Sequence, residues 1–189
     1  VNPEDWGVRP VREAGFTTVY TQTGSGNIIG GTGIAIKLWG HTAEEMMIPG
    51  TEEMKFALGE NPKRFHGLEQ HRMPWTRMGT AALLRETLYK AKNYSDKLKA
   101  AETDPSKAPE PDFKLDALVR VIRGEQRVRI HCHRADDIIT AIRIAKEFGL
   151  DFTLEHATEG YTVRDVIAEN HWSCIVGPLS LPPSQQRIG

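Results

Sequence analysis

Three histidines at the ends of two expected strands are the residues best suited to chemistry in this chain. His131 and His133 lie two residues apart, so their side chains project to the same side of a strand, whereas Cys132 between them points the opposite way and packs. His156 ends the next expected strand, which a parallel sheet places about 4.8 Å away, in phase with His131. Neutral imidazole is a common ligand of zinc-like cations. The pattern predicts a divalent metal site at His131 and His156, with His133 beside it; the alternative is a polar strand end whose histidines form local hydrogen bonds and face water.

A lysine and a glutamate form the second candidate group. Lys55 lies within an apolar strand pattern, where a charged side chain is costly unless it is paired or modified. Carbamylation by CO₂ would turn Lys55 into an anionic bridge between two metal ions, whereas the alternative is a lysine that snorkels out of the sheet. Glu60 follows the same strand and is an alternative ligand or general base. We expect Lys55 to point into the histidine pocket.

Several other residues offer weaker signals. Arg64 and Arg77 are candidates for binding a substrate carboxylate or phosphate, although a solvated surface charge is the commoner role of such residues. The stretch 23–33 holds five glycines, but its G-x-G-x-x-x-G spacing is one residue longer than the dinucleotide-binding fingerprint. We therefore interpret this stretch as an active-site loop. The remaining histidines lack a ligand-like partner and are expected to be structural or exposed; they are His41, His66, His71 and His171.

The elements that must position these side chains follow a strand–helix alternation, which is typical of a parallel sheet with crossover helices. The clearest part is the last third of the chain, where residues 127–131, 152–156 and 173–176 are expected strands and residues 136–148 and 162–170 are expected helices. Further strands are predicted at 17–20, 34–38 and 54–58, and further helices at 3–14, 76–101 and 113–123. Residues 102–112 are polar and proline-rich, which predicts a flexible linker. In total, we expect five or six parallel strands.

Composition excludes several classes of protein. Hydrophobic residues make up 39% of the 189 residues, which is ordinary for one globular domain. Lys and Arg number 24 against 25 Asp and Glu, so the basic excess typical of nucleic-acid binding is lacking. Two cysteines do not make a disulfide framework, and no apolar run approaches the ~18 residues of a membrane span. The chain begins at Val1 without a signal-like segment, so we expect that its true N-terminus is missing and, on balance, that it is cytoplasmic.

Several blocks of the sequence resemble the imidazolonepropionase-like metal-dependent amidohydrolases. The most specific blocks are Met54-Lys-Phe-Ala-Leu-Gly-Glu-Asn-Pro-Lys-Arg64, Thr76-Arg-Met-Gly79, Ile130-His-Cys-His-Arg-Ala-Asp-Asp137 and Leu154-Glu-His-Ala-Thr-Glu-Gly160. The resemblance runs from about residue 3 to residue 183. It implies an α/β fold of the (β/α)₈ TIM-barrel type and hydrolysis of amide or cyclic C–N bonds by a metal-activated water.

The resemblance also implies roles for individual residues. His131 matches the histidine ligand of the fifth barrel strand and His156 that of the sixth. Lys55 or Glu60 matches the position of a carbamylated lysine or glutamate, and His133 would face the substrate. The implied cofactor is one or two divalent ions, zinc first among them, and the implied partner is a small-molecule amide.

The family's first-strand His-x-His and last-strand aspartate have no counterpart in this sequence. A barrel of about 250 residues would be incomplete here, with about strands 2 or 3 to 7 present in a single partial domain, residues 1–189. We therefore expect that the isolated chain is inactive and that its exposed sheet edges favour association with another copy. The competing interpretations are a metal- or small-molecule-binding α/β module without catalysis and, less favoured by the glycine spacing, a nucleotide-binding domain.

Overall fold

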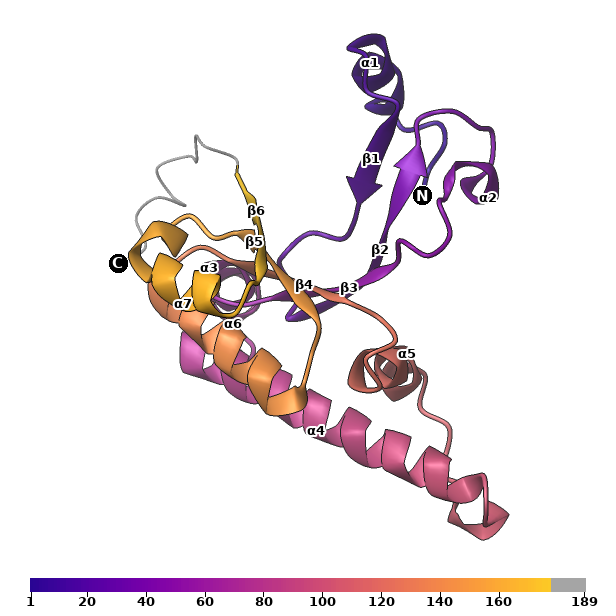
Figure 1. Ribbon diagram of the computed structural model, residues 1–189, viewed down its shortest axis with the longest axis vertical. Helices are drawn as coiled ribbons and strands as arrows, with labels where there is room; N and C mark the ends of the chain where they lie inside the picture. The colour runs from indigo at the N-terminus through magenta and orange to yellow at the C-terminus, as the bar shows by residue number, and fades with distance from the viewer. Residues whose placement is uncertain (178–189) are drawn as a thin grey trace.

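One sheet of six strands in sequence order runs through residues 1–177, the part of the chain that this computed structural model describes (Figure 1). The strands are β1 (Thr18–Thr21), β2 (Ile29–Lys37), β3 (Glu53–Ala57), β4 (Val128–Cys132), β5 (Phe152–His156) and β6 (Ser173–Val176). The pairs from β3 to β6 are parallel, whereas β1–β2 and β2–β3 are antiparallel. The prediction of five or six parallel strands is therefore wrong for β1 and β2. Residues 22–28, which join them, are too few for a parallel crossover.

The predicted helices are present, and those after β3 connect the parallel strands. The helices of the described residues are α1 (Val8–Glu13), α2 (Ala43–Met46), α3 (Glu60–Lys63), the π-helix η1 (Arg64–Glu69), α4 (Arg77–Ala101), the 3₁₀ helix η2 (Pro105–Lys107), α5 (Phe113–Ile122), α6 (Ala135–Phe148), the 3₁₀ helix η3 (Gly160–Val163) and α7 (Arg164–Glu169). Thr76 caps α4 by accepting from Gly79 N, and Gly149 ends α6 in the left-handed conformation, as a C′ glycine does. The expected linker at 102–112 holds η2 and the Asp112 cap of α5.

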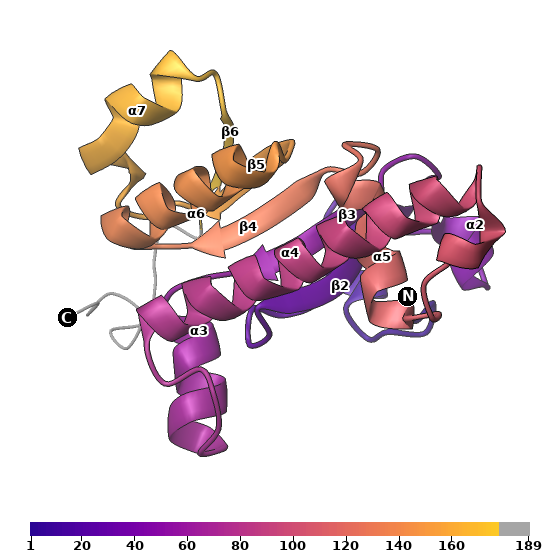
Figure 2. The ribbon, with the colours of Figure 1, turned by 90° about the horizontal axis from the view of Figure 1, so that it is seen from below.

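The main core lies between one face of the sheet and helices α4, α5 and α6; α4 and α6 run side by side on that face (Figures 1 and 2). Because side chains alternate along a strand, every second residue of the strands faces these helices. Phe56, Ile130 and Leu154 are among these residues, and all three are at most 1% exposed. The alternate residues of the same strands face the other way, and several of them are polar: Lys55, Arg129, His131 and Glu155. The helix-covered face thus provides stability, and the opposite face carries the candidate chemistry.

The glycine-rich stretch is loop only in its first half. Strand β2 begins at Ile29 and includes three of the glycines, and its pairing with β3 shifts register between Ile29 and Gly31. Gly31 has a φ of 112°, a conformation that side chains other than glycine's rarely adopt. These glycines therefore serve a β-bulge, which bends the strand, and not only a loop.

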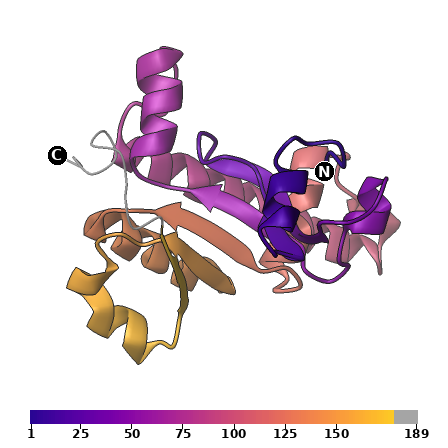
Figure 3. The ribbon, with the colours of Figure 1, turned by 90° about the horizontal axis from the view of Figure 1, so that it is seen from above.

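The N-terminal elements form a satellite at one end of the sheet. Ile36, Leu38 and Met46 make a small core of their own, against which Val8 and Val19 pack. Helices α1 and α2 stand at the end of the molecule away from α7 (Figure 3). The Arg129 guanidinium of β4 nonetheless lies 3.5 Å from the centroid of the Tyr20 ring of β1, and Gln22 contacts Glu155 of β5, so the N-terminal segment also touches the parallel strands.

The sheet is curled and open, consistent with part of an α/β barrel. β1 and β6 are its two edge strands, and every residue of β6 is exposed. No helix in residues 1–177 is long and apolar enough to cross a membrane. The predicted domain, residues 1–189, and the resemblance to about residue 183 both extend past the residues that the structure describes.

Candidate active site

The three predicted histidines meet at the carboxyl ends of β4 and β5. The ring centroid of His131 lies 4.7 Å from that of His133 and 4.6 Å from that of His156. The rings of His133 and His156 stack at 5.0 Å. The expectation that His131 and His156 point to one place agrees with this arrangement.

His156 reaches the cluster by a route that the sequence did not indicate. In the register of β4 with β5, His131 pairs with Glu155, whereas His156 pairs with Cys132. Cys132 faces the helices, as predicted, and is fully buried in the main core. Plain alternation would send His156 the same way, but its φ of 69° is left-handed and the following Ala157 has a φ of 40°. The predicted phase is therefore wrong, and a change of backbone conformation at the strand end brings the ring to the other histidines.

Each ring has a defined set of partners. His156 Nδ1 contacts the carbonyl oxygen of Gly177, to which it donates as N–H, so that the lone pair is on Nε2. His133 Nδ1 lies 2.7 Å from Thr158 Oγ1. His131 Nε2 lies 3.1 Å from Asn61 Nδ2, and His131 Nδ1 is buried without a partner within the described residues.

The environment keeps the rings of His131 and His133 neutral. The pKa of His131 is lowered to about 2, first by burial and then by the neighbouring His156, His133 and Lys55. Each of these disfavours a positive charge on the His131 ring. Burial and the His156 ring lower the pKa of His133 to about 4. Neutral imidazole is the form that binds metal ions.

Acidification is expected to destabilise the chain through His131. In the unfolded chain its pKa is about 6.5, so below this pH the unfolded state binds a proton that the folded state does not. Stability should therefore fall as pH is lowered, with His131 contributing a loss of about 2 kcal/mol between pH 7 and pH 5. Urea unfolding at the two pH values measures this loss, and His131→Asn is the comparison. An equal pH dependence in His131→Asn would contradict the prediction.

Lys55 is buried on the same face of the sheet, paired with a residue that the sequence interpretation missed. Its ammonium forms an ion pair with Glu155, and both side chains are at most 5% exposed. Gln22 Nε2 donates to the same carboxylate at 2.7 and 2.8 Å, and Arg129 Nη1 lies 3.4 Å from it. Burial alone would raise the pKa of the Glu155 carboxyl, but Lys55, Gln22 and Arg129 together hold it below its usual value. A glutamate in a buried strand, one position before His156, was the signal available in the sequence.

Glu60 and Arg77 share one network of ion pairs, whereas Arg64 lies in another pair. Arg77 Nη2 is 3.1 Å from Glu60 Oε2, and its Nε is 3.1 Å from Asp137 Oδ2. Lys63 Nζ also contacts Glu60, at 3.3 Å. Arg64 pairs with Glu69 at 3.5 Å, and both side chains are exposed. The structure therefore gives Arg77 and Glu60 a shared local network, whereas Arg64 stands at the surface.

Gly59 permits this network to form next to β3. Its φ is 83°, and an added Cβ would lie 2.6 Å from Asp137 Oδ2. Gly59→Ala is therefore expected to cost about 1–3 kcal/mol, because it combines backbone strain with a clash at a buried carboxylate. Chemical unfolding measures the cost, with Gly124→Ala as the control, since Gly124 has a similar φ of 73° but open space around it. Equal losses in the two variants would show that only backbone strain acts at Gly59.

The donor chemistry of the cluster fits a divalent cation, but the coordination set is not closed. Three imidazoles lie together, and His156 donates its Nδ1–H to a carbonyl, as metal-binding histidines usually do. Within residues 1–177, however, no group of three or more His, Cys, Asp or Glu side chains is arranged to hold a metal ion. Glu60 is engaged by Arg77, and Lys55 by Glu155, so neither completes the set.

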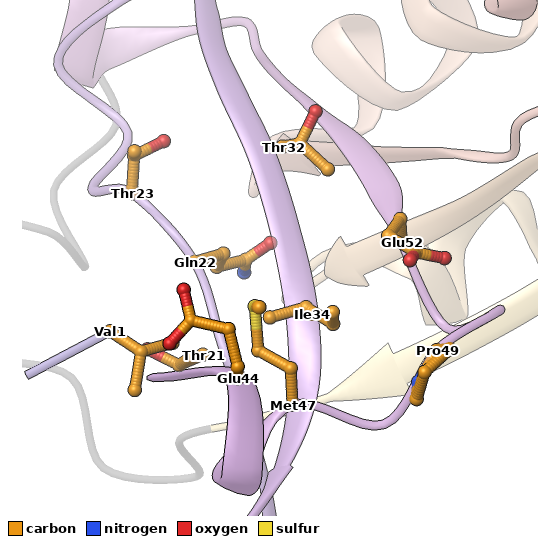
Figure 4. A pocket seen from close by; sticks show the side chains of 10 residues that line it. All are labelled: Val1, Thr21, Gln22, Thr23, Thr32, Ile34, Glu44, Met47, Pro49 and Glu52. Carbon is orange, nitrogen blue, oxygen red and sulfur yellow. The ribbon is translucent and has the colours of Figure 1, made fainter. Parts of the chain in front are cut away.

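A large pocket lies beside the polar face of the sheet and not at the histidines. It has a volume of about 760 Å³, and residues from β1, β2 and the following segment line it (Figure 4). Gln22 belongs to this wall and also binds the Glu155 carboxylate, so one side chain joins the pocket to the buried charges. The pocket was not foreseen from the sequence.

Comparison with known proteins points in one direction. A solved structure of an amidohydrolase from Thermotoga maritima MSB8 matches 94% of this chain with a TM-score of 0.89 and 42% sequence identity. The curated protein amidohydrolase tasK of Hapsidospora irregularis is 27% identical over an alignment of 185 residues, and the match covers 87% of this chain. Both relatives are named amidohydrolases. This chain is therefore similar to part of two proteins named amidohydrolases.

The chain spans only part of each of these relatives. It covers 46% of the Thermotoga chain and 19% of the tasK protein. No protein-family model matches the sequence. The imidazolonepropionase-like subtype therefore stays a prediction.

Proposed function

We propose that this chain provides part of the active site of a metal-dependent amidohydrolase that hydrolyses amide or cyclic C–N bonds of small molecules. The observation that carries the proposal is the cluster of three imidazoles at the carboxyl ends of adjacent parallel strands. Parallel α/β folds place their active sites at this edge. The two amidohydrolase relatives support the reaction class.

In this proposal His131 and His156 hold a divalent cation, with zinc as the first choice. When bound, such a cation activates a water molecule and polarises the scissile carbonyl. His156 is prepared for this role, because its Nδ1–H is donated to Gly177 O and its Nε2 lone pair is available. His133 lies beside both rings, where it is placed to hold or pass a proton.

The remaining predicted site residues have defined places in this scheme. Glu60 is proposed as the carboxylate that moves protons, and Arg77 and Arg64 as substrate-binding groups. Since Arg77 already binds Glu60 and Asp137, a substrate anion would have to share its guanidinium with them. Lys55 would bind a second metal ion only as a carbamate, which requires that it leave the pair with Glu155; mass spectrometry of the intact chain would detect the added CO₂.

We also propose that the isolated chain turns over little or no substrate. Catalytic zinc usually has three protein ligands, and the described residues do not arrange three. The open edges at β1 and β6 are proposed to pair with a second copy. Two free thiols, Cys132 and Cys174, favour a cytoplasmic location within the same proposal.

Zinc titration by calorimetry, followed by assays against N-acyl amino acids, dipeptides and cyclic amides, tests the proposal. We expect zinc binding that requires His131 and His156, without turnover by this chain. Zinc binding that is equal in the wild-type chain and a His131→Ala, His156→Ala double variant would contradict the metal site. Metal-dependent turnover abolished by His131→Ala would contradict the inactivity. Zinc binding without turnover in a longer protein that contains this chain would favour the non-catalytic binding module.

A further inference from the structure

Asn61 is the side chain that contacts the ligating ring of His131, and the sequence motifs gave it no role. It follows Glu60 in helix α3, directly after β3, and is partly buried. Its Nδ2 lies 3.1 Å from His131 Nε2 and 2.7 Å from Ser25 Oγ. One amide group therefore joins the glycine-rich loop to the buried histidine.

We propose that Asn61 is a positioning residue for His131, whose amide holds the ring and selects the ring nitrogen that carries the proton. A neutral imidazole carries one proton, on either Nδ1 or Nε2. Because Asn61 Nδ2 donates, His131 Nε2 accepts and the proton is on Nδ1. That Nδ1 is buried without a partner, so Asn61 is the one hydrogen-bonding group within residues 1–177 that decides between the two forms.

The loop on the other side of Asn61 is held in place by contacts with η1. His66 Nε2 lies 3.1 Å from Asn27 Oδ1, and His66 is buried in the π-helix η1. The Phe65 ring packs on the backbone at Gly26, where an added Cβ would lie 3.2 Å from the ring. These contacts hold the two residues that follow Ser25, whose hydroxyl accepts from the Asn61 amide.

A cation at His131 needs a free ring lone pair, which a half-turn of the amide would supply, because Asn61 Oδ1 would then accept from His131 Nε2–H and leave the Nδ1 lone pair free. Asparagine is suited to this dual role because it carries both a donor and an acceptor. A carboxylate can only accept, and a leucine can do neither. The link between the proton position and metal binding rests on the proposed function. The proton position on His131 does not depend on that function.

Nuclear magnetic resonance of the metal-free 189-residue chain with ¹⁵N-labelled histidine tests the proposal, since protonated and unprotonated ring nitrogens differ in chemical shift. In the wild-type chain we expect one form of His131, with the proton on Nδ1. Asn61→Asp should move the proton to Nε2, and Asn61→Leu should give a mixture of both forms. Asn93→Leu, on the exposed face of α4, is the matched control and should match the wild type.

A proton that stays on Nδ1 in Asn61→Asp, or a single unchanged form in Asn61→Leu, would overturn the inference. If Asn61→Leu fails to fold, as judged by circular dichroism, Asn61→Asp still decides. Zinc titration gives the second readout, because loss of a partner behind a metal-binding histidine weakens binding on the order of 10-fold or more. Unchanged zinc affinity in Asn61→Leu would overturn the link to the metal, whereas absence of zinc binding in the wild type would contradict the proposed function and leave the proton result standing.

Discussion

Replacing Lys55 with methionine is expected to lower the free energy of unfolding by about 3 kcal/mol, because it leaves the Glu155 carboxylate buried without its main partner. Glu155 would keep its hydrogen bonds with Gln22 and the more distant Arg129, which limits the loss of stability. Denaturation by urea measures the change. Methionine has nearly the length of lysine, so little cavity forms and the effect reports the charge.

Two further variants isolate the buried pair. The double variant Lys55→Met, Glu155→Met should recover most of the loss, because no unpaired charge remains. Lys90→Met is the matched control, since Lys90 pairs with Glu86 on the surface of α4 with both side chains more than half exposed. Such a pair contributes about 0.5 kcal/mol or less. Similar losses in Lys55→Met and Lys90→Met would contradict the role of the Lys55–Glu155 pair.

Replacing His131 with alanine is expected to weaken zinc binding at least about 100-fold, or about 2.8 kcal/mol at about 1.4 kcal/mol per factor of ten. His131 is the central ring of the cluster, in contact with both other histidines, and it is 4% exposed. Its loss removes one proposed ligand and leaves His156 without its nearest neighbour. Calorimetric titration of the folded variant measures the change.

The control for His131→Ala is His41→Ala, which removes an exposed histidine outside the cluster. We expect its zinc affinity to equal that of the wild type. His131→Asn keeps a polar side chain at the buried position and separates loss of the ligand from loss of packing. If His131→Ala and His41→Ala bind zinc equally well, His131 is not a ligand.

Local patterns in the sequence were sufficient to predict the elements around the site. Strands β5 and β6 have the predicted limits, and α4 and α6 differ from prediction by one residue at most. These segments were predictable because alternation, helical spacing, caps and glycine stops act between residues close in sequence. The direction of β1 and β2 was not predictable in this way, since it depends on how the chain returns to the sheet.

The sequence by itself determined which side chains could do chemistry, since His131, His133 and His156 fall at strand ends whatever the rest of the fold does. The tertiary structure decided how they are used. Register placed Glu155, and not His156, beside His131, and a left-handed φ at His156 brought its ring back to the cluster. The pairing of Lys55 with Glu155 and the contact of Asn61 with His131 join residues 100 and 70 positions apart. No local pattern specifies such contacts, because they depend on how neighbouring strands align and on the backbone conformation of single residues.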